Sequence, residues 1–279
     1  MTSPAISIIV PCFKQAEYLP EALDSLIAQT FENWEAIVVN DGSPDHTEEI
    51  ALAYAAKDPR IKYLPLENGG VARARNRGIA IAQGEYILPL DADDTIAPTY
   101  LEKAKAALDN NPALKAVYCQ AQLFGSQKGP WGVKYRDYKT LLVVNSIFVT
   151  TLFRKADAEA IGGFDEKMIS GHEDWDFFIR LLGGDGHIYQ IPETLFNYRI
   201  KNLSRNTEAV KRLSDTQYYL LDKNRALYQQ FYPLPFNGIG GAEIMAAEAE
   251  ALRSEVVKYR ERRRNRWYKR LYRALLGKQ

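Results

Sequence analysis

Three carboxylates follow an apolar run in the middle of the chain. The run begins at Tyr86, and Asp91, Asp93 and Asp94 stand at its end. Its composition is typical of a strand buried on both faces, and a turn directly after it would let Asp91 and Asp93 converge. Converging carboxylates repel each other unless a cation lies between them, and Mg²⁺ and Mn²⁺ prefer oxygen ligands and often share them with a substrate diphosphate. The spacing therefore predicts a metal-diphosphate site. The alternative is an acidic turn that caps a helix beginning near Pro98.

A fourth acid, Asp174, is a candidate general base. It lies three and four residues before Phe177 and Phe178, so on a helix it shares their inward face. In the first helical turn the helix dipole stabilises a carboxylate anion, and such an anion can take a proton if it lines a pocket. The alternative is an internal ion pair with Arg180 or Arg199.

The neighbouring acid, Glu173, has a structural explanation. Ser170 and Glu173 have the spacing of a capping box, in which each side chain bonds to a backbone N–H at the start of a helix. This pattern predicts a helix that continues through Leu182.

Arg75 is a candidate ligand-binding cation. It belongs to a predicted helix that starts at Val71, and at 3.6 residues per turn it lies on the flank of the apolar stripe. A half-buried arginine needs an anionic or carbonyl partner. That partner is either a bound nucleotide or an internal acid.

The elements that must position these residues alternate along the first part of the chain. Four strands are predicted, at 6–10, 35–39, 61–66 and 86–90, and four helices, at 19–29, 46–56, 71–82 and 98–110. Such alternation indicates an α/β fold with a mostly parallel, Rossmann-like central sheet flanked by helices. Ligands of these sheets bind at the carboxyl ends of the strands. Pro89 conflicts with a central strand, because proline cannot donate to the sheet.

The rest of the chain gives weaker patterns. Strands are predicted at 115–124, 147–153, 187–191 and 194–199, and the segment 125–138 is predicted to be a loop. Helical segments at 206–230 and 242–276 flank a breaker-rich linker. We therefore expect one domain at 1–204, with a nucleotide-binding half at 1–110 and an acceptor-side half at 111–204. A helical extension is expected at 205–279.

Composition excludes several protein classes. Two cysteines and three histidines form neither a disulfide framework nor a zinc motif. There is no signal-peptide pattern and no apolar stretch of about 20 residues, so a cytoplasmic location is expected. No G-x-G-x-x-G or Walker sequence follows a strand, which argues against dinucleotide-binding Rossmann and P-loop enzymes.

The last 27 residues differ from the rest. Residues 253–279 contain 11 lysines and arginines and two glutamates, although the whole chain has a net charge of only +1. A helical stripe of aromatic and leucine side chains from Trp267 to Leu275 runs among them, which is typical of helices that lie on anionic membranes. The alternative is packing on the domain or on a second subunit. Nucleic-acid binding is not expected.

Together these motifs resemble the inverting nucleotide-sugar glycosyltransferases of family 2, which have the GT-A fold. The resemblance covers roughly residues 5–205. It is carried by the segments Ile6-Ser-Ile-Ile-Val-Pro-Cys-Phe13, Val39-Asn-Asp-Gly-Ser43, Gly69-Gly-Val-Ala-Arg-Ala-Arg-Asn76, Leu90-Asp-Ala-Asp-Asp94, Gly162-Gly-Phe-Asp165 and His172-Glu-Asp-Trp175.

The resemblance implies a role for each matching residue. Asp91 would approach the ribose and the metal, Asp93 would bind Mn²⁺ or Mg²⁺, and Asp174 would be the general base. The remaining residues would line the nucleotide base pocket (Pro11, Phe13, Asp41 and Arg75) or shape the sugar and acceptor side (Glu173 and Trp175). Many relatives carry a metal-binding histidine near Lys201, so here the metal would lose a ligand or Lys201 would contact the diphosphate.

The activity implied is metal-assisted inverting transfer of a sugar. The donor would be a nucleotide-diphosphate sugar, a UDP-sugar in the first place, and the acceptor a glycan or lipid-linked molecule of bacterial surface polysaccharide synthesis. The alternative is a nucleotide-sugar-binding or scaffold protein without catalysis. The enzyme would be cytoplasmic, peripheral on the inner face of the membrane, and able to oligomerise through its C-terminal helices.

Overall fold

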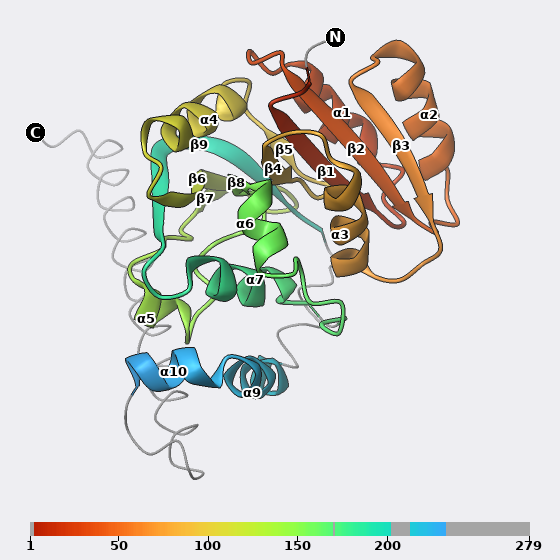
Figure 1. Cartoon of the computed structure of the whole chain (residues 1–279). Coiled ribbons are helices and arrows are strands. Elements are labelled where there is room, and N and C mark those ends of the chain that lie inside the picture. Colours follow the sequence, from red (N-terminus) through yellow and green to blue (C-terminus); the bar gives the residue numbers. More distant parts are fainter. Residues whose placement is uncertain (1–2, 170, 202–212, 233–279) are drawn as a thin grey trace, which may run out of the picture. The chain divides into compact units, whose positions relative to one another are not determined.

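The computed structural model describes residues 3–169, 171–201 and 213–232 (Figure 1). The chain divides into two compact units, 1–224 and 225–279, and the predicted domain limits at 110 and 204 stay predictions. The predicted linker, the long helix after it and the basic tail 253–279 lie outside the described residues. No helix within the described residues is long and apolar enough to cross a membrane.

A single mixed sheet is the framework of the first unit. In its described residues the order is β3-β2-β1-β4-β8-β6-β9-β5, and β7 pairs with β6. The strands are β1 Ile6–Cys12, β2 Trp34–Asp41, β3 Ile61–Leu66, β4 Tyr86–Pro89, β5 Thr95–Ile96, β6 Leu114–Gly125, β7 Gly129–Trp131, β8 Leu152–Arg154 and β9 His187–Ile200. The predicted α/β, GT-A-type architecture is confirmed.

The strand directions decide where ligands can bind. β1 is parallel to β2 and β4, and β2 is parallel to β3. β8 is antiparallel to both β4 and β6, and β6 is parallel to β9. The carboxyl ends of β1, β2, β3, β4, β6 and β9 therefore lie at one edge of the sheet. The strand order reverses between β1 and β4, which is where ligands bind in open α/β sheets.

Helices cover both faces of the sheet (Figure 1). Among the described residues, the helices of the first unit are α1 Leu19–Ile27, α2 Thr47–Lys57, α3 Val71–Ile81, α4 Tyr100–Asn110, α5 Tyr138–Leu141, α6 Lys155–Ala160, α7 Glu173–Leu182 and α9 Leu213–Lys223; α10 Arg225–Phe231 belongs to the second unit. Apolar side chains of α1, α2 and α4 share one core with Ile6, Ile8 and Val10. On the opposite face, Gly78 of α3 packs on Ile9 and Val39. Alternate residues of β1 thus contact opposite layers.

Long-range pairing explains where the strand predictions were wrong. β9 is one strand because the register against β6 shifts between Ile191 and Thr194, and this irregularity accommodates Pro192. β8 is shorter than the strand predicted at 147–153, and β7 lies within the segment predicted as a loop.

Pro89 is compatible with β4 for a geometric reason. The amide of Tyr86 donates to Ala5, just before β1, and that of Leu90 donates to Ile9 of β1. The nitrogen of Pro89 therefore faces the other side. There the pairing with β8 has already ended at Ile87. No sheet hydrogen bond is therefore lost.

Gly78 allows α3 to lie close to the sheet, and this contact can be tested. A Cβ at Gly78 would lie 2.5 Å from Cγ2 of Ile9 and 3.1 Å from Cγ2 of Val39, both on stiff β-branched side chains. Overpacking of this kind costs about 1–3 kcal/mol, more than the roughly 1 kcal/mol gained in helix propensity. We expect Gly78→Ala to lower the melting temperature by about 2–4 °C for each net kcal/mol lost.

Arg77→Ala is the matched control for this change, because Arg77 is the exposed neighbour of Gly78. Its melting temperature should stay close to that of the wild type. A Gly78→Ala protein as stable as the Arg77→Ala protein would mean that α3 can move away from the sheet.

Candidate active site

The acidic turn after β4 does not gather its carboxylates around one point. Asp91 Oδ1 lies 2.7 Å from Nη2 of Arg75, and Asp93 Oδ2 lies 2.5 Å from Nζ of Lys201. Asp94 is buried and accepts a hydrogen bond of 2.8 Å from the backbone N–H of Arg199. Burial and the other two carboxylates raise the pKa of Asp94. Each acid of the turn therefore has a different partner.

This arrangement does not fit the metal site predicted on Asp91 and Asp93. Both carboxylates hold side-chain cations, and a divalent ion beside Asp93 would meet the ammonium of Lys201. Among the described residues, no group of three or more histidine, cysteine and acidic side chains could hold a metal. The alternative of a helix-capping turn is not observed either, because Thr99 precedes α4 without a side-chain cap.

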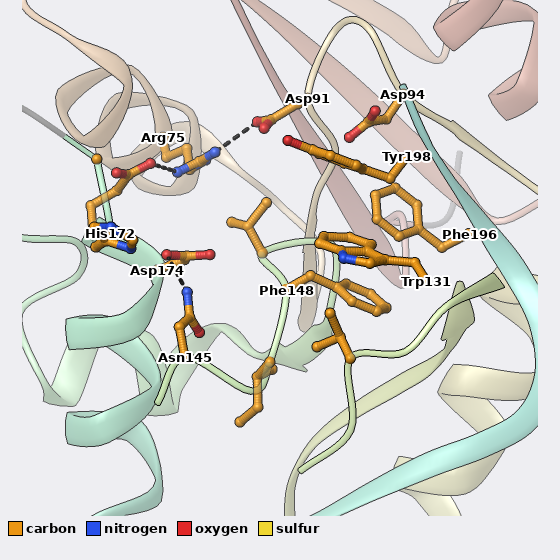
Figure 2. Close-up of a pocket in the computed structure, with 15 residues that line it drawn as sticks. Arg75, Asp91, Asp94, Trp131, Asn145, Phe148, His172, Asp174, Phe196 and Tyr198 are labelled. Carbon is orange, nitrogen blue, oxygen red and sulfur yellow. Dashed lines mark hydrogen bonds and ion pairs between the residues drawn. The ribbon is translucent and has the colours of Figure 1, made fainter. Parts of the chain in front are cut away.

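Arg75 connects the turn to the start of α7 (Figure 2). Its side chain is 1% exposed, and Nη1 lies 2.6 Å from Oε1 of Glu173 while Nη2 binds Asp91. Burial alone would lower the pKa of Arg75, but the two carboxylates raise it, so the guanidinium stays charged. Two kinds of partner were predicted for Arg75, a bound nucleotide or an internal acid. In the structure its partners are the internal acids Asp91 and Glu173.

Glu173 owes its position to this ion pair. α7 begins at Glu173, and His172 precedes it in the left-handed region without a side-chain cap. The predicted capping box involves Ser170, which lies outside the described residues. Trp175, two residues after Glu173, is buried, and its indole N–H donates to the carbonyl of Leu141.

Asp174 points into the cavity beside Arg75 (Figure 2). Its Oδ1 accepts hydrogen bonds from Nδ2 of Asn145 (3.2 Å) and the N–H of Trp175 (2.8 Å), so Oδ2 is the oxygen that can accept a proton. Burial and then the charge of Glu173 raise the pKa of Asp174 to about 7, against the opposing effect of Arg75. The shift is opposite to the one expected from the helix dipole alone.

The alternative ion pairs predicted for Asp174 are not formed. Arg180 pairs with Asp176 at 2.7 Å, and Arg199 pairs with Glu21.

The cavity has a volume of about 280 Å³ and two chemically different walls. Arg75, Asp91, Asn145 and Asp174 are on the polar side, and Trp131, Phe148, Phe196 and Tyr198 form the aromatic wall, with Asp94 beside Tyr198 (Figure 2). Glu173 also lines the cavity. Trp131 stacks on Tyr198 with 4.4 Å between ring centroids and on Phe148 with 5.7 Å. Hydroxyl-binding groups opposite an apolar surface suit a sugar ring, which has polar edges and C–H faces.

The residues predicted for the nucleotide pocket lie at the carboxyl ends of β1 and β2. Pro11 is buried in β1, and Phe13 beyond it is 39% exposed. The carboxylate of Asp41 accepts the backbone N–H groups of Gly69 (2.8 Å) and Gly70 (2.9 Å). Asp41 thus fixes the turn before α3. Unlike Arg75 and Asp91, these three residues do not line the cavity.

Sequence reasoning missed most of the aromatic wall and Asn145. Tyr198 could have been found, because it is the last aromatic residue before Lys201 on a predicted strand. Trp131 lies in β7 and Phe148 shortly before β8, and both of these strands pair with β6. No local pattern indicates this contact. Asn145 lies outside the helices and strands, so it gives no periodic signal.

Comparisons with known proteins agree with this geometry. Residues 7–165 match the Glycosyl transferase family 2 domain. An uncharacterized glycosyltransferase of Rickettsia typhi is 34% identical over 227 residues, which cover 76% of this chain and 69% of the relative.

Two solved structures are similar in fold. Residues 1–349 of S. aureus TarS, solved in complex with UDP-GlcNAc, have a TM-score of 0.64 and 20% identity, covering 81% of this chain and 73% of that one. The mannosyltransferase PcManGT from Pyrobaculum calidifontis, solved with GDP-Man and Mn²⁺, has a TM-score of 0.61 and 21% identity. The match covers 91% of this chain and 76% of that one. With the family match over more than half of its length, the chain belongs to glycosyl transferase family 2 and is a glycosyltransferase with the GT-A fold.

Proposed function

We propose that the chain transfers a sugar, with inversion, from a nucleoside-diphosphate sugar to a hydroxyl group of a glycan or lipid-linked acceptor. A UDP-sugar is the first candidate donor. The observation that supports this most is Asp174, whose carboxyl group points into a sugar-sized cavity and has a pKa of about 7. The basic tail 253–279 supports an acceptor at an anionic membrane on the cytoplasmic side, as in bacterial surface polysaccharide synthesis.

The proposed step is one direct displacement. Asp174 takes the proton of the acceptor hydroxyl, whose oxygen attacks the anomeric carbon of the donor. The bond from that carbon to the diphosphate oxygen breaks on the opposite side, and its electron pair leaves with the phosphate. Attack from one face and departure from the other invert the anomeric configuration.

The donor would lie at the edge where β1, β2 and β4 end. Asp91 and Arg75 connect this edge to the cavity, because both residues line the cavity and they form an ion pair with each other. The aromatic wall would pack against the sugar and exclude water from the reacting carbon.

Asp174→Asn should abolish the proton transfer and leave the fold intact. Loss of a general base reduces turnover by about 10²–10⁴-fold, and Asn can keep the hydrogen bonds from Asn145 and Trp175. The folded-state pKa of about 7 is above the ordinary value of 3.8, so the charge of Asp174 costs stability as the pH rises from about 4 to 7. We therefore expect the variant to melt at or above the wild-type temperature at about pH 8.

Asp185→Asn is the control for this variant, because Asp185 is exposed just beyond the other end of α7. It should have wild-type turnover. Wild-type turnover in Asp174→Asn as well would remove Asp174 from the role of base.

The pH dependence of the reaction should report the same group. The base must be deprotonated, so kcat/KM should rise tenfold per pH unit below about pH 7 and become level above it. The measurement is initial velocity at low donor concentration from about pH 5 to about pH 9. A profile that is already level at about pH 5 would contradict a base with a raised pKa.

The activity itself can be tested with a panel of UDP- and GDP-sugars. We expect release of nucleoside diphosphate from one of them, slowly to water and faster to a glycan or lipid-linked acceptor. NMR of the product should show the inverted anomeric configuration. Tight binding of UDP or GDP without turnover for any donor and acceptor would instead favour a nucleotide-sugar-binding protein without catalysis.

A further inference from the structure

Sheet topology brings the end of β9 to the acidic turn. β9 runs in the same direction as β4, so Lys201, which follows β9, arrives at the edge where β4 ends. β5 pairs with β9 through Thr95 with Asn197 and Ile96 with Phe196. This pairing fixes the turn that precedes β5 against the residues that follow Asn197.

The ammonium of Lys201 is held in place by three groups. Its Nζ lies 2.5 Å from Oδ2 of Asp93 and donates to Oε1 of Gln15 at 2.9 Å. It also lies 4.9 Å from the ring centroid of Tyr18. The side chain is only 18% exposed. Gln15 and Tyr18 follow β1, so the ammonium lies between the ends of β1 and β4, at the point where the strand order reverses.

The other two carboxylates of the turn have hydrogen-bond partners of their own, although the charge of Lys201 also acts on Asp94. Asp91 has Arg75 as its partner, and Asp94 accepts the N–H of Arg199. Arg199 also donates through Nε to the carbonyl of Asp93 at 2.7 Å. Lys201 and Arg199 are two residues apart at the end of β9, and together they fix the turn from one side. The position of the Lys201 ammonium beside Asp93 is thus set by the fold of the protein.

We propose that Lys201, rather than a divalent metal ion, is the cation that binds the diphosphate of the donor and stabilises it as the leaving group. This inference rests on the proposed function. An ammonium has three N–H donors, of which Asp93 and Gln15 accept two, and the third can bind a phosphate oxygen. As the bond to the anomeric carbon breaks, its electron pair moves to the phosphate, and the adjacent positive charge stabilises it. Sugar transfer by this protein therefore needs no added metal.

The test is calorimetric titration of the full chain with UDP and with GDP, in EDTA and in Mn²⁺. For the nucleotide that binds, we expect affinities within about twofold in the two buffers. Lys201→Met should weaken binding in EDTA by about 10- to 100-fold, the effect of removing a hydrogen bond to a charged group. Lys201→His, which replaces the ammonium by a common metal ligand, should bind better in Mn²⁺ than in EDTA.

Lys103→Met is the matched control, because Lys103 also lies 2.5 Å from a carboxylate, that of Glu193, on the surface of α4. It should bind the nucleotide as the wild type does. Wild-type binding that requires Mn²⁺ would overturn the role of Lys201 while leaving the proposed function intact. Equal binding by Lys201→Met and wild type in EDTA would do the same. Absence of UDP and GDP binding in both buffers would overturn the proposed function as well.

Discussion

The site depends on one buried cation, the guanidinium of Arg75. It is 1% exposed and lies between Asp91 and Glu173, with nitrogen–oxygen distances of 2.7 and 2.6 Å. Burying this charge is favourable only because both carboxylates pair with it, and removing one partner of such a group leaves an unbalanced buried charge. The three residues belong to α3, the end of β4 and the start of α7. One ion-pair network therefore joins the strand-helix repeats of the chain to the helix that carries the candidate base.

Burial, and after it the same network, sets the pKa of Asp174. Glu173 pairs with Arg75, and its negative charge stands next to Asp174 in the sequence. Together with burial, this charge moves the pKa of Asp174 to about 7, although Arg75 and two hydrogen bonds oppose the shift. A carboxyl group with this pKa is an effective base near neutral pH. The raised pKa comes first from the burial of Asp174 and then from the placement of Glu173 beside it.

The sequence predicted the features that depend on local periodicity and missed those that depend on distant pairing. Alternating apolar runs located β1 to β4 and the helices between them, because each of these elements buries a stripe set by its own period. Glu173 pairs with Arg75, which is 98 residues away in the chain, and no local pattern indicates this. The stack of Trp131 on Tyr198 likewise joins β7 to β9, two strands that meet only through β6. The sequence and its family resemblance identified Asp174 as the candidate base. Its raised pKa could not be predicted, because it depends on the three-dimensional environment.

The acidic turn contributes to two places, the cavity of the candidate base and the site of the Lys201 ammonium. Asp91 and Asp94 line the cavity that contains Asp174, whereas Asp93 contacts Lys201 beside the ends of β1 and β4. A displacement that inverts a carbon needs a proton acceptor on one side and a stabilised anion on the other, and the two must not neutralise each other. Here the candidate base lies in the cavity, whereas the ammonium pairs with Asp93, which does not line that cavity. One short segment can thus serve both halves of the reaction, because Arg75 of α3 holds Asp91 and Lys201 after β9 holds Asp93.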